Sequence, residues 1–263
     1  MYAFTYEAPT STADAAKRAV AGARPIAGGQ SLLPSLRLRL ADPGELVDLG
    51  RIPDLAGIRK EGDQIVIGAM ARHQQVADSQ EVQSAIPALA DLANHIGDRQ
   101  VRARGTLGGS LANNDPAACY PAAVLALGAT IVTNQREIAA DDFFVGMFTT
   151  ALKEGELITA VRFPVAAKAS YQKFRQGASR FALVGVFVAQ TAGGVRVAVT
   201  GAASSVFRQS ALEAALNQSF TVASAEGVKV DASDLGSDLH ATPAYRAQLI
   251  SVLTQRAVSA ILT

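Results

Sequence analysis

The chain has 263 residues, of which 49% are hydrophobic and 18% are charged, and its formal net charge is +1. This length and apolar content suffice for one large domain or for two to three smaller ones. The balanced charge argues against nucleic acid or an anionic membrane surface as a partner, because both require clustered lysine and arginine. The longest basic cluster, Arg99, Arg102 and Arg104, is local and fits either a solvated loop face or a contact with one anion.

Cysteine content and apolar runs limit the chemistry and the location further. Cys119 is the single cysteine, so this chain alone cannot supply a disulfide framework or a cysteine-ligated iron–sulfur or zinc site. No apolar run reaches the ~18 residues that a bilayer-spanning helix needs. The first residues, Met1–Glu7, have neither the basic region nor the apolar core of a signal peptide. We therefore expect a cytoplasmic protein without a membrane span.

The first two thirds of the chain are predicted to alternate short strands with helices. Residues Ser11–Ala23 are expected to form an amphipathic helix that Ser11 or Thr12 caps. Leucines alternate with arginines after Pro34, which favours a half-buried strand over Leu32–Leu40. Further strands are expected at Arg24–Ala27, Glu45–Leu49, Gln64–Ala69, Ala129–Thr133 and Leu157–Phe163, and helices at Ile86–Ile96 and Pro121–Leu127.

The pattern changes after Phe163. The segment Pro164–Ala169 has no periodicity and is the best candidate for a linker between two domains. Strands are expected at Tyr171–Arg175, Ala182–Gln190 and Val195–Thr200, and helices at Ser210–Asn217 and Thr242–Leu262. Ala192-Gly193-Gly194 is typical of a hairpin turn between the last two strands. This C-terminal part is therefore expected to be an antiparallel sheet with helices on one face.

Two glycine-rich turns are the most informative feature of the sequence. The first is Ala27–Ser31, with the sequence Ala-Gly-Gly-Gln-Ser, and the second is Gly105–Ala112, with the sequence Gly-Thr-Leu-Gly-Gly-Ser-Leu-Ala. Paired glycines let the backbone turn sharply and approach a ligand, and successive N–H groups can converge on an anion. Two such turns indicate one diphosphate held from two sides, and hence a nucleotide cofactor. An ordinary structural turn is the alternative interpretation of each.

Other nucleotide-binding and catalytic motifs are absent from the sequence. Neither turn has the Gly-x-Gly-x-x-Gly spacing of a Rossmann fold, and the Gly-Lys-Ser/Thr tripeptide of a Walker A loop does not occur. His73, His95 and His240 are scattered, without the spacing of a metal site. No serine of either turn has the Gly-x-Ser-x-Gly context of a hydrolase nucleophile. His95–Asp98 is interpreted as a helix end capped by Gly97 rather than as a catalytic pair.

The residues that follow the second turn leave more than one interpretation open. Asn114 and Asp115 fit a structural turn, and either one also fits a contact with a ribitol or ribose hydroxyl group. Cys119 is expected to be a small buried residue, since a reactive thiol requires an exposed and electropositive environment.

The glycine turns and their flanks resemble a known family, the medium, FAD-binding subunit of the molybdenum hydroxylases. This family includes aerobic carbon monoxide dehydrogenase, xanthine dehydrogenase and bacterial dehydrogenases of N-heteroaromatic compounds. The segments that carry the resemblance are Ala27–Pro34, Leu46–Pro53, Arg104–Ala112 and Asp115–Ala118. The resemblance runs through the whole chain and continues in Gly155–Ile158 and Tyr171–Phe174.

The resemblance implies an α+β fold with bound FAD. A two-subdomain FAD-binding domain of the vanillyl-alcohol-oxidase (PCMH) type is expected at residues 1–165, with subdomains of about 1–55 and 56–165. A smaller α/β domain of the carbon monoxide dehydrogenase flavoprotein type, with an antiparallel sheet, is expected at 170–263. Non-covalent FAD would lie extended between the subdomains, with the two glycine turns around its diphosphate. Ile96 would lie along the nucleotide part of FAD, Ile158 would pack on it, and Lys173 would reach the flavin region and stabilise the reduced flavin.

The complete set of cofactor-binding residues expected from the turns and from the resemblance is Ala27, Gly28, Gly29, Gln30, Ser31, Leu32, Ile96, Thr106, Gly108, Gly109, Ser110, Asn114, Asp115, Cys119, Ile158 and Lys173. One of these positions departs from the family pattern. The family commonly has an acid near the cofactor where this chain has Cys119. A thiol accepts hydrogen bonds poorly, so Asp115, Tyr120 or a water molecule would have to replace that contact.

The resemblance also implies a complex. A large subunit would hold the molybdenum cofactor and oxidise the substrate, and a small subunit would carry iron–sulfur clusters of the 2Fe–2S type. The medium subunit would pass electrons through FAD to an external acceptor, within a dimer of heterotrimers. The substrate stays open, and so does the choice of quinone, nicotinamide or oxygen as acceptor. A free-standing flavoenzyme of the same fold and an assembly module without FAD are the alternatives.

Overall fold

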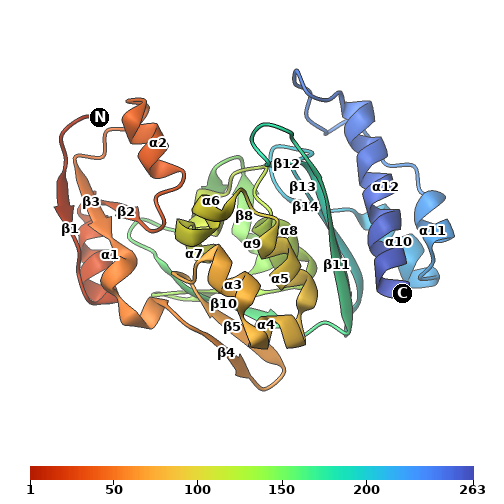
Figure 1. Cartoon of the computed structure of the whole chain (residues 1–263), viewed down its shortest axis with the longest axis horizontal. Coiled ribbons are helices and arrows are strands. Elements are labelled where there is room, and N and C mark those ends of the chain that lie inside the picture. Colours follow the sequence, from red (N-terminus) through yellow and green to blue (C-terminus); the bar gives the residue numbers. More distant parts are fainter.

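The computed structural model describes residues 1–263 and contains three main sheets that follow one another along the chain (Figure 1). The first sheet is parallel, with the strand order β1-β3-β2. Its elements are β1 (Thr5–Glu7), α1 (Thr12–Val20), β2 (Arg24–Ile26), α2 (Leu32–Arg37) and β3 (Glu45–Asp48). Helix α1 begins where expected, because the Ser11 side chain accepts a hydrogen bond from the Asp14 N–H group.

The second sheet is antiparallel, and its strand order is β4-β5-β10-β6-β7. Its strands are β4 (Ile58–Glu61), β5 (Gln64–Gly68), β6 (Thr130–Thr133), β7 (Glu137–Ala139) and β10 (Ile158–Pro164). The helices of this region are α3 (His73–Asp78), α4 (Gln80–Ala85), α5 (Pro87–Asn94), α6 (Arg99–Arg104), α7 (Leu107–Asn113), α8 (Tyr120–Ala126) and α9 (Ala140–Phe143). A small hairpin of β8 (Phe144–Gly146) and β9 (Thr149–Thr150) follows α9.

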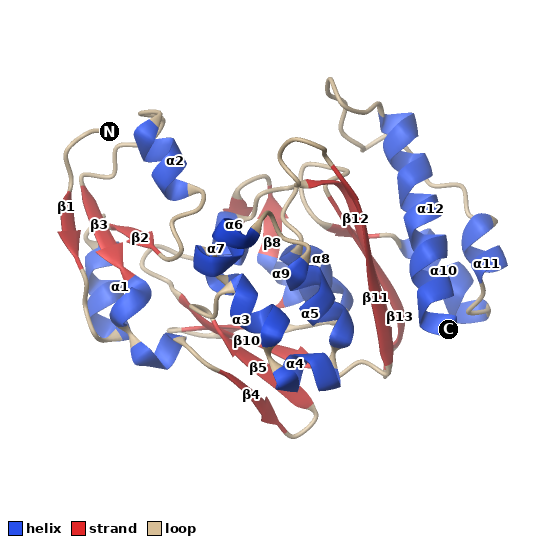
Figure 2. Cartoon of the chain, viewed as in Figure 1, coloured by secondary structure: helices blue, strands red, loops and turns tan.

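The third sheet is also antiparallel, as the sequence predicted for the C-terminal part. Its elements are β11 (Lys168–Arg175), β12 (Ala182–Thr191), β13 (Gly194–Thr200), β14 (Phe207–Arg208), α10 (Ser210–Gln218), α11 (Val222–Glu226) and α12 (Pro243–Leu262). Thr191 pairs with Gly194, so Ala192 and Gly193 form the tight loop of the expected hairpin. Helix α12 packs on β11 and β12, whereas α5 and α8 of the preceding region also contact this sheet (Figure 2).

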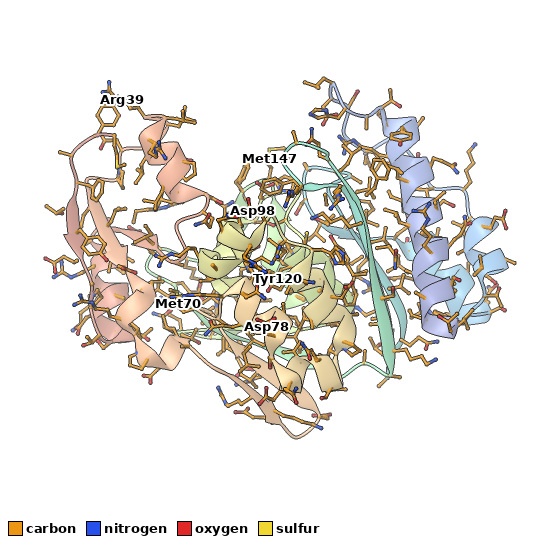
Figure 3. All side chains as sticks on the ribbon, viewed as in Figure 1. Arg39, Met70, Asp78, Asp98, Tyr120 and Met147 are labelled. Atoms are coloured by element: carbon orange, nitrogen blue, oxygen red, sulfur yellow. The ribbon has the colours of Figure 1, made fainter.

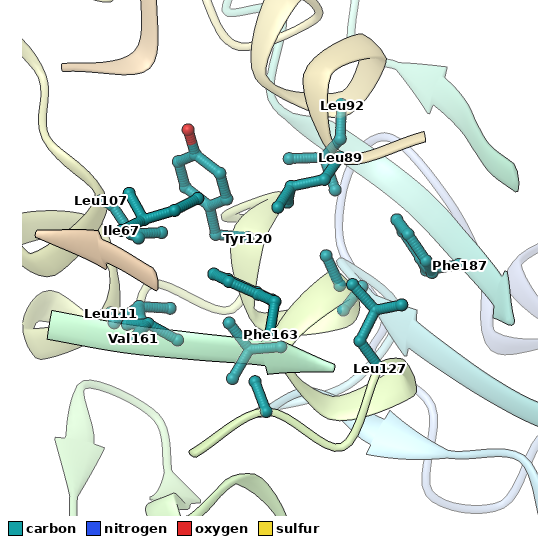
Figure 4. Close-up of a cluster of buried hydrophobic side chains, with 14 of the residues drawn as sticks. Ile67, Leu89, Leu92, Leu107, Leu111, Tyr120, Leu127, Val161, Phe163 and Phe187 are labelled. Carbon is teal, nitrogen blue, oxygen red and sulfur yellow. The ribbon is translucent and has the colours of Figure 1, made fainter. Parts of the chain in front are cut away.

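The largest core lies between the second and third sheets. Figure 4 shows side chains of β5, β10, α5, α7 and α8 meeting there, with Phe187 of β12 reaching the same cluster. The nearly continuous run of small and apolar residues in α8 is buried on all sides, because this helix contacts α5, α7 and the third sheet. A second core joins the outer face of the third sheet to α10–α12. The middle region is therefore packed tightly against the C-terminal one.

The expected strand at Leu32–Leu40 is wrong, because residues Leu32–Arg37 form helix α2. Only Leu36 of the alternating leucines is fully buried, and it packs on β2 and β3. Leu38 and Leu40 are 70% and 77% exposed, so the alternation does not correspond to a buried strand face. The helix begins directly from the first glycine turn, since the Leu33 N–H group donates to the Gly29 carbonyl.

The sheets change close to the two expected boundaries. The first sheet and its short helical turns end at Leu55, and β4 begins at Ile58. Between β10 and β11 only residues 165–167 are irregular, so the linker is shorter than the predicted Pro164–Ala169. The division into domains at 1–165 and 170–263 stays a prediction that these breaks support. No helix of the structure is both long enough and apolar enough to cross a membrane.

Candidate cofactor site

The first glycine turn, Ala27–Ser31, connects β2 to α2 and presents a run of free donors. The backbone N–H groups of Gly28 through Leu32 donate to no acceptor within the chain. Gly29 has a φ of +73°, a conformation that glycine adopts at little cost. Consecutive N–H groups without internal partners, at the start of a helix, are the arrangement that binds phosphate oxygens.

The two glycine turns touch each other. A Cβ atom at Gly28 would lie 2.2 Å from the Arg104 carbonyl oxygen and 2.7 Å from the Gly105 Cα atom. A Cβ atom at Gly109 would lie 3.4 Å from the Ala27 Cβ atom. The first turn belongs to the first sheet and the second turn to the helices of the second sheet. Their contact therefore places both turns at the junction of the two parts, as the sequence analysis expected.

The second turn is the beginning of helix α7 and uses most of its own donors. The Thr106 side chain caps the helix by accepting from the Gly109 N–H group, at 3.2 Å. The N–H groups of Leu107 and Gly108 donate to backbone carbonyls that follow β5, those of Ala71 and Ala69. This turn therefore offers a ligand the Thr106 N–H group and the hydroxyls of Thr106 and Ser110. The free N–H groups come mainly from the first turn, so the two sides of the site are unequal.

Packing by itself requires glycine at position 108. A Cβ atom there would lie 2.6 Å from the Ala69 Cβ atom. A Cβ atom at Gly105 would similarly lie 2.5 Å from Nε2 of His73. These close contacts hold α7 against the end of β5 and fix the position of the second turn.

Asn114 has a structural role in this geometry. It ends α7 in the left-handed conformation, with a φ of +43°, and it is 1% exposed. Its side-chain Nδ2 donates to the carbonyls of Gly146 and Thr149, each at 2.8 Å. Both amide hydrogens are thereby used to hold the β8–β9 hairpin, whose tip carries the exposed Met147 (Figure 3). Asp115 accepts from the Ala117 N–H group through Oδ1, which leaves Oδ2 free for a ligand hydroxyl.

Lys173 reaches from the third sheet to two segments of the preceding region. From β11, its Nζ atom donates to the His95 carbonyl at 3.0 Å and to Sγ of Cys119 at 3.3 Å. Cys119 is 4% exposed, as expected for a small buried residue. The His95 carbonyl directly precedes Ile96 in the chain, so Nζ of Lys173 lies next to the backbone of the segment that carries Ile96. A contact of the Ile96 side chain with a cofactor stays a prediction.

Ile158 and Leu32 lie outside this group. Ile158 begins β10 opposite Thr133, is 5% exposed and belongs to the main core. Leu32 is the first residue of α2 and packs partly on the small core of the first sheet. A contact of either side chain with a cofactor stays a prediction.

A buried polar pair that the sequence does not predict lies beneath the second turn. The rings of His73 and Tyr120 lie 5.3 Å apart, and both the His73 Nδ1 atom and the Tyr120 hydroxyl are buried without a hydrogen-bond partner. Figure 4 shows the Tyr120 ring between Leu107 and Leu89, with its hydroxyl pointing away from the drawn cluster. Burial, and then the charge of Arg102, lower the pKa of His73 to about 4, so its ring is neutral at pH 7. No local pattern around either residue signals this contact, because 47 positions separate them in the sequence.

Metal chemistry has no visible ligand set in this chain. No group of three or more histidine, cysteine, aspartate or glutamate side chains converges on one point. The free N–H groups of the first turn and the glycine contacts between the turns instead fit a diphosphate-bearing cofactor.

Comparison with known proteins agrees with this geometry. Residues 2–166 match the protein family described as the FAD binding domain in molybdopterin dehydrogenase. The carbon monoxide dehydrogenase medium chain of Hydrogenophaga pseudoflava is 38% identical over 215 residues, which cover 76% of this chain and 75% of that protein. The nicotine 6-hydroxylase medium subunit of Paenarthrobacter nicotinovorans is 38% identical over 191 residues, covering 69% and 68%.

Solved structures show the same fold over nearly the whole chain. A carbon monoxide dehydrogenase from Hydrogenophaga pseudoflava superposes with a TM-score of 0.90 at 34% identity, covering 99% of this chain and 98% of that one. Quinoline 2-oxidoreductase from Pseudomonas putida 86 superposes with a TM-score of 0.89 at 30% identity, covering 99% of this chain and 97% of that one. The fold is accordingly a PCMH-type FAD-binding domain followed by a C-terminal domain. This chain belongs to the FAD-binding medium subunits of the molybdenum hydroxylases.

Proposed function

We propose that this chain holds non-covalent FAD between its two glycine turns and passes electrons from iron–sulfur clusters of a partner subunit to an external acceptor. The observation that carries the proposal is the run of unpartnered N–H groups at Gly28–Leu32, in a turn that touches the second glycine turn. These groups would bind the diphosphate, and the hydroxyls of Thr106 and Ser110 would donate from the other side. FAD, when bound, supplies the ability to take up and release electrons.

The remaining site residues would orient the cofactor rather than react with it. The free Oδ2 atom of Asp115 suits a ribitol or ribose hydroxyl as donor. Lys173 and Cys119 would line one end of the cofactor, with the Lys173 ammonium fixed by the His95 carbonyl. A fixed ammonium costs little reorganisation when it meets a negatively charged or electron-rich group.

The partners are proposed from the relatives. The similar proteins are named as medium chains or subunits of carbon monoxide dehydrogenase, nicotine 6-hydroxylase and 6-hydroxypseudooxynicotine dehydrogenase. By this likeness we propose a large molybdenum subunit that oxidises the substrate and a small iron–sulfur subunit that delivers the electrons. The complex would be a dimer of heterotrimers.

Anaerobic mixing of the FAD-loaded chain with its reduced iron–sulfur subunit tests the proposed electron transfer. Flavin absorbance near 450 nm, roughly the position for any oxidised flavin, should bleach on mixing. Reduced iron–sulfur subunit mixed with chain stripped of FAD is the control. If the reduced iron–sulfur subunit leaves the flavin absorbance unchanged, but a nicotinamide and a small substrate bleach it, the chain would instead be a free-standing flavoenzyme. A chain that cannot take up FAD would identify an assembly module.

A further inference from the structure

The segment between α7 and α8, Asp115–Cys119, contains two expected cofactor contacts but no regular secondary structure. Its internal backbone hydrogen bonds are few: Ala117 donates to Oδ1 of Asp115, and Ala118 donates to the Asp115 carbonyl. The carbonyls of Pro116 and Ala118 have no partner within the segment. Both carbonyls are partly buried, and a carbonyl that is withdrawn from water without a donor is costly, so these two groups depend on another part of the chain.

That other part is the end of β13, in the third sheet. The Thr200 hydroxyl lies 2.9 Å from the Pro116 carbonyl oxygen and 2.7 Å from the Ala118 carbonyl oxygen, and it donates its one hydrogen between them. The Gly201 N–H group also donates to Pro116, at 2.8 Å. Thr200 is the one residue of the chain that donates to the Ala118 carbonyl.

The position of the Thr200 hydroxyl is set by its neighbours in the sheet. Thr200 is 1% exposed and pairs with Gly185 of β12. A Cβ atom at Gly185 would lie 3.0 Å from the Thr200 methyl carbon, so the glycine leaves just enough room for that methyl group. Gly201 has a φ of +81°, and a Cβ atom there would lie 2.5 Å from the Ala182 carbonyl oxygen. The local backbone therefore allows few other orientations of the donors.

We propose that Thr200 is a positioning residue for the cofactor site. From the third sheet it holds the carbonyls of the Asp115–Cys119 segment, while Lys173 of the same sheet holds Cys119 at the end of that segment. The C-terminal sheet thereby fixes the wall of a site whose glycine turns belong to the other two sheets. This inference rests on the proposed function, because it takes FAD as the ligand that contacts the Asp115–Cys119 segment.

Three substitutions in the full-length chain test the proposal. Thr200→Val keeps the shape and removes the hydroxyl, and Thr200→Ser restores the hydroxyl. Thr254→Val is the matched control, because Thr254 is equally buried in the same domain but donates to the Ile250 carbonyl within its own helix. Titration of the apo-protein with FAD, monitored by the quenching of flavin fluorescence, should show that Thr200→Val binds FAD about tenfold more weakly than wild type does. Thr200→Ser and Thr254→Val should stay close to the wild-type affinity.

Hydrogen–deuterium exchange supplies a readout that needs no FAD. Peptides covering residues 112–120 should exchange faster in Thr200→Val than in wild type, and their exchange rate should be unchanged in Thr254→Val. Equal FAD affinity and equal exchange of wild type and Thr200→Val would overturn the proposal, and so would the same losses in Thr254→Val. If wild type fails to bind FAD while exchange still rises only in Thr200→Val, the proposed function fails but the role of Thr200 in holding the segment stands.

Discussion

Replacing Gly28 by alanine should separate the two glycine turns. The added Cβ atom would lie 2.2 Å from the Arg104 carbonyl oxygen, and both groups belong to backbones that cannot rotate away. The turns must move apart by about 0.8 Å to restore even a tight contact of 3.0 Å. Strain of this kind typically costs about 1–3 kcal/mol. The apo-protein relieves it by opening, whereas bound FAD requires the closed arrangement, so we expect the Kd for FAD to rise about tenfold or more.

The assay is the same fluorescence titration, applied to wild type, Gly28→Ala and Gly193→Ala. Gly193 is the matched control, because its Cβ atom would meet nothing closer than the Thr191 hydroxyl at 3.8 Å, in the hairpin of the C-terminal sheet. We expect Gly193→Ala to bind FAD as wild type does. Unchanged affinity in Gly28→Ala would refute the reasoning, and so would an equal loss in both variants.

Three further predictions concern buried polar groups. Burial alone would raise the pKa of Glu156, but hydrogen bonds from Arg136 and other donors outweigh burial and lower this pKa to about 2. The ionised Glu156 therefore stabilises the fold above about pH 5, and this stabilisation is lost as the pH falls towards 2. Glu156→Gln should flatten the Tm profile in that window and cost on the order of 2 kcal/mol at pH 7, since Arg136 is partly exposed. The pKa of His73 is about 4 in the folded chain and 6.5 in the unfolded chain, so the unfolded chain binds one more proton between these values. The free energy of unfolding should therefore fall as the pH drops from 6.5 to 4. Urea denaturation of His73→Gln should show that this pH dependence is removed. Asn114→Asp removes both side-chain donors to the β8–β9 hairpin, so chymotrypsin should cleave at Phe148 faster than in wild type, and an unchanged rate would contradict the role given to Asn114.

Local signals predicted the elements that local physics determines. Ser11 caps α1 and Ala192-Gly193 joins two strands, because each depends on a few adjacent residues. The Leu32–Leu40 strand failed because alternation identifies a strand only where one face is buried, and Leu38 and Leu40 face solvent.

The candidate site depends on contacts that no local pattern reveals. Position 28 must be a glycine because a side chain there would collide with the Arg104 backbone, which is distant in the sequence. Lys173 is held by Cys119, which is also distant from it in the sequence. The sequence predicts two equivalent anion-binding turns. The second turn begins a helix that Thr106 caps, and it uses most of its backbone donors within the chain, so the two turns are unequal in the donors that they leave free.

The substitution of the expected acid by Cys119 is compatible with the observed site. Sγ of Cys119 accepts from Lys173, which also donates to the His95 carbonyl, so the ammonium stays fixed without a carboxylate partner. Lys173 forms no salt bridge with a carboxylate of the chain. An anionic group of a bound cofactor would complete this arrangement.

The most direct test of the central claim is the flavin content of the purified full-length chain. We predict a yellow protein whose flavin is equimolar with the chain, is released completely by acid and is identified by chromatography as FAD. Colourless protein that takes up no added FAD would contradict the account, as would a flavin that stays attached after acid treatment.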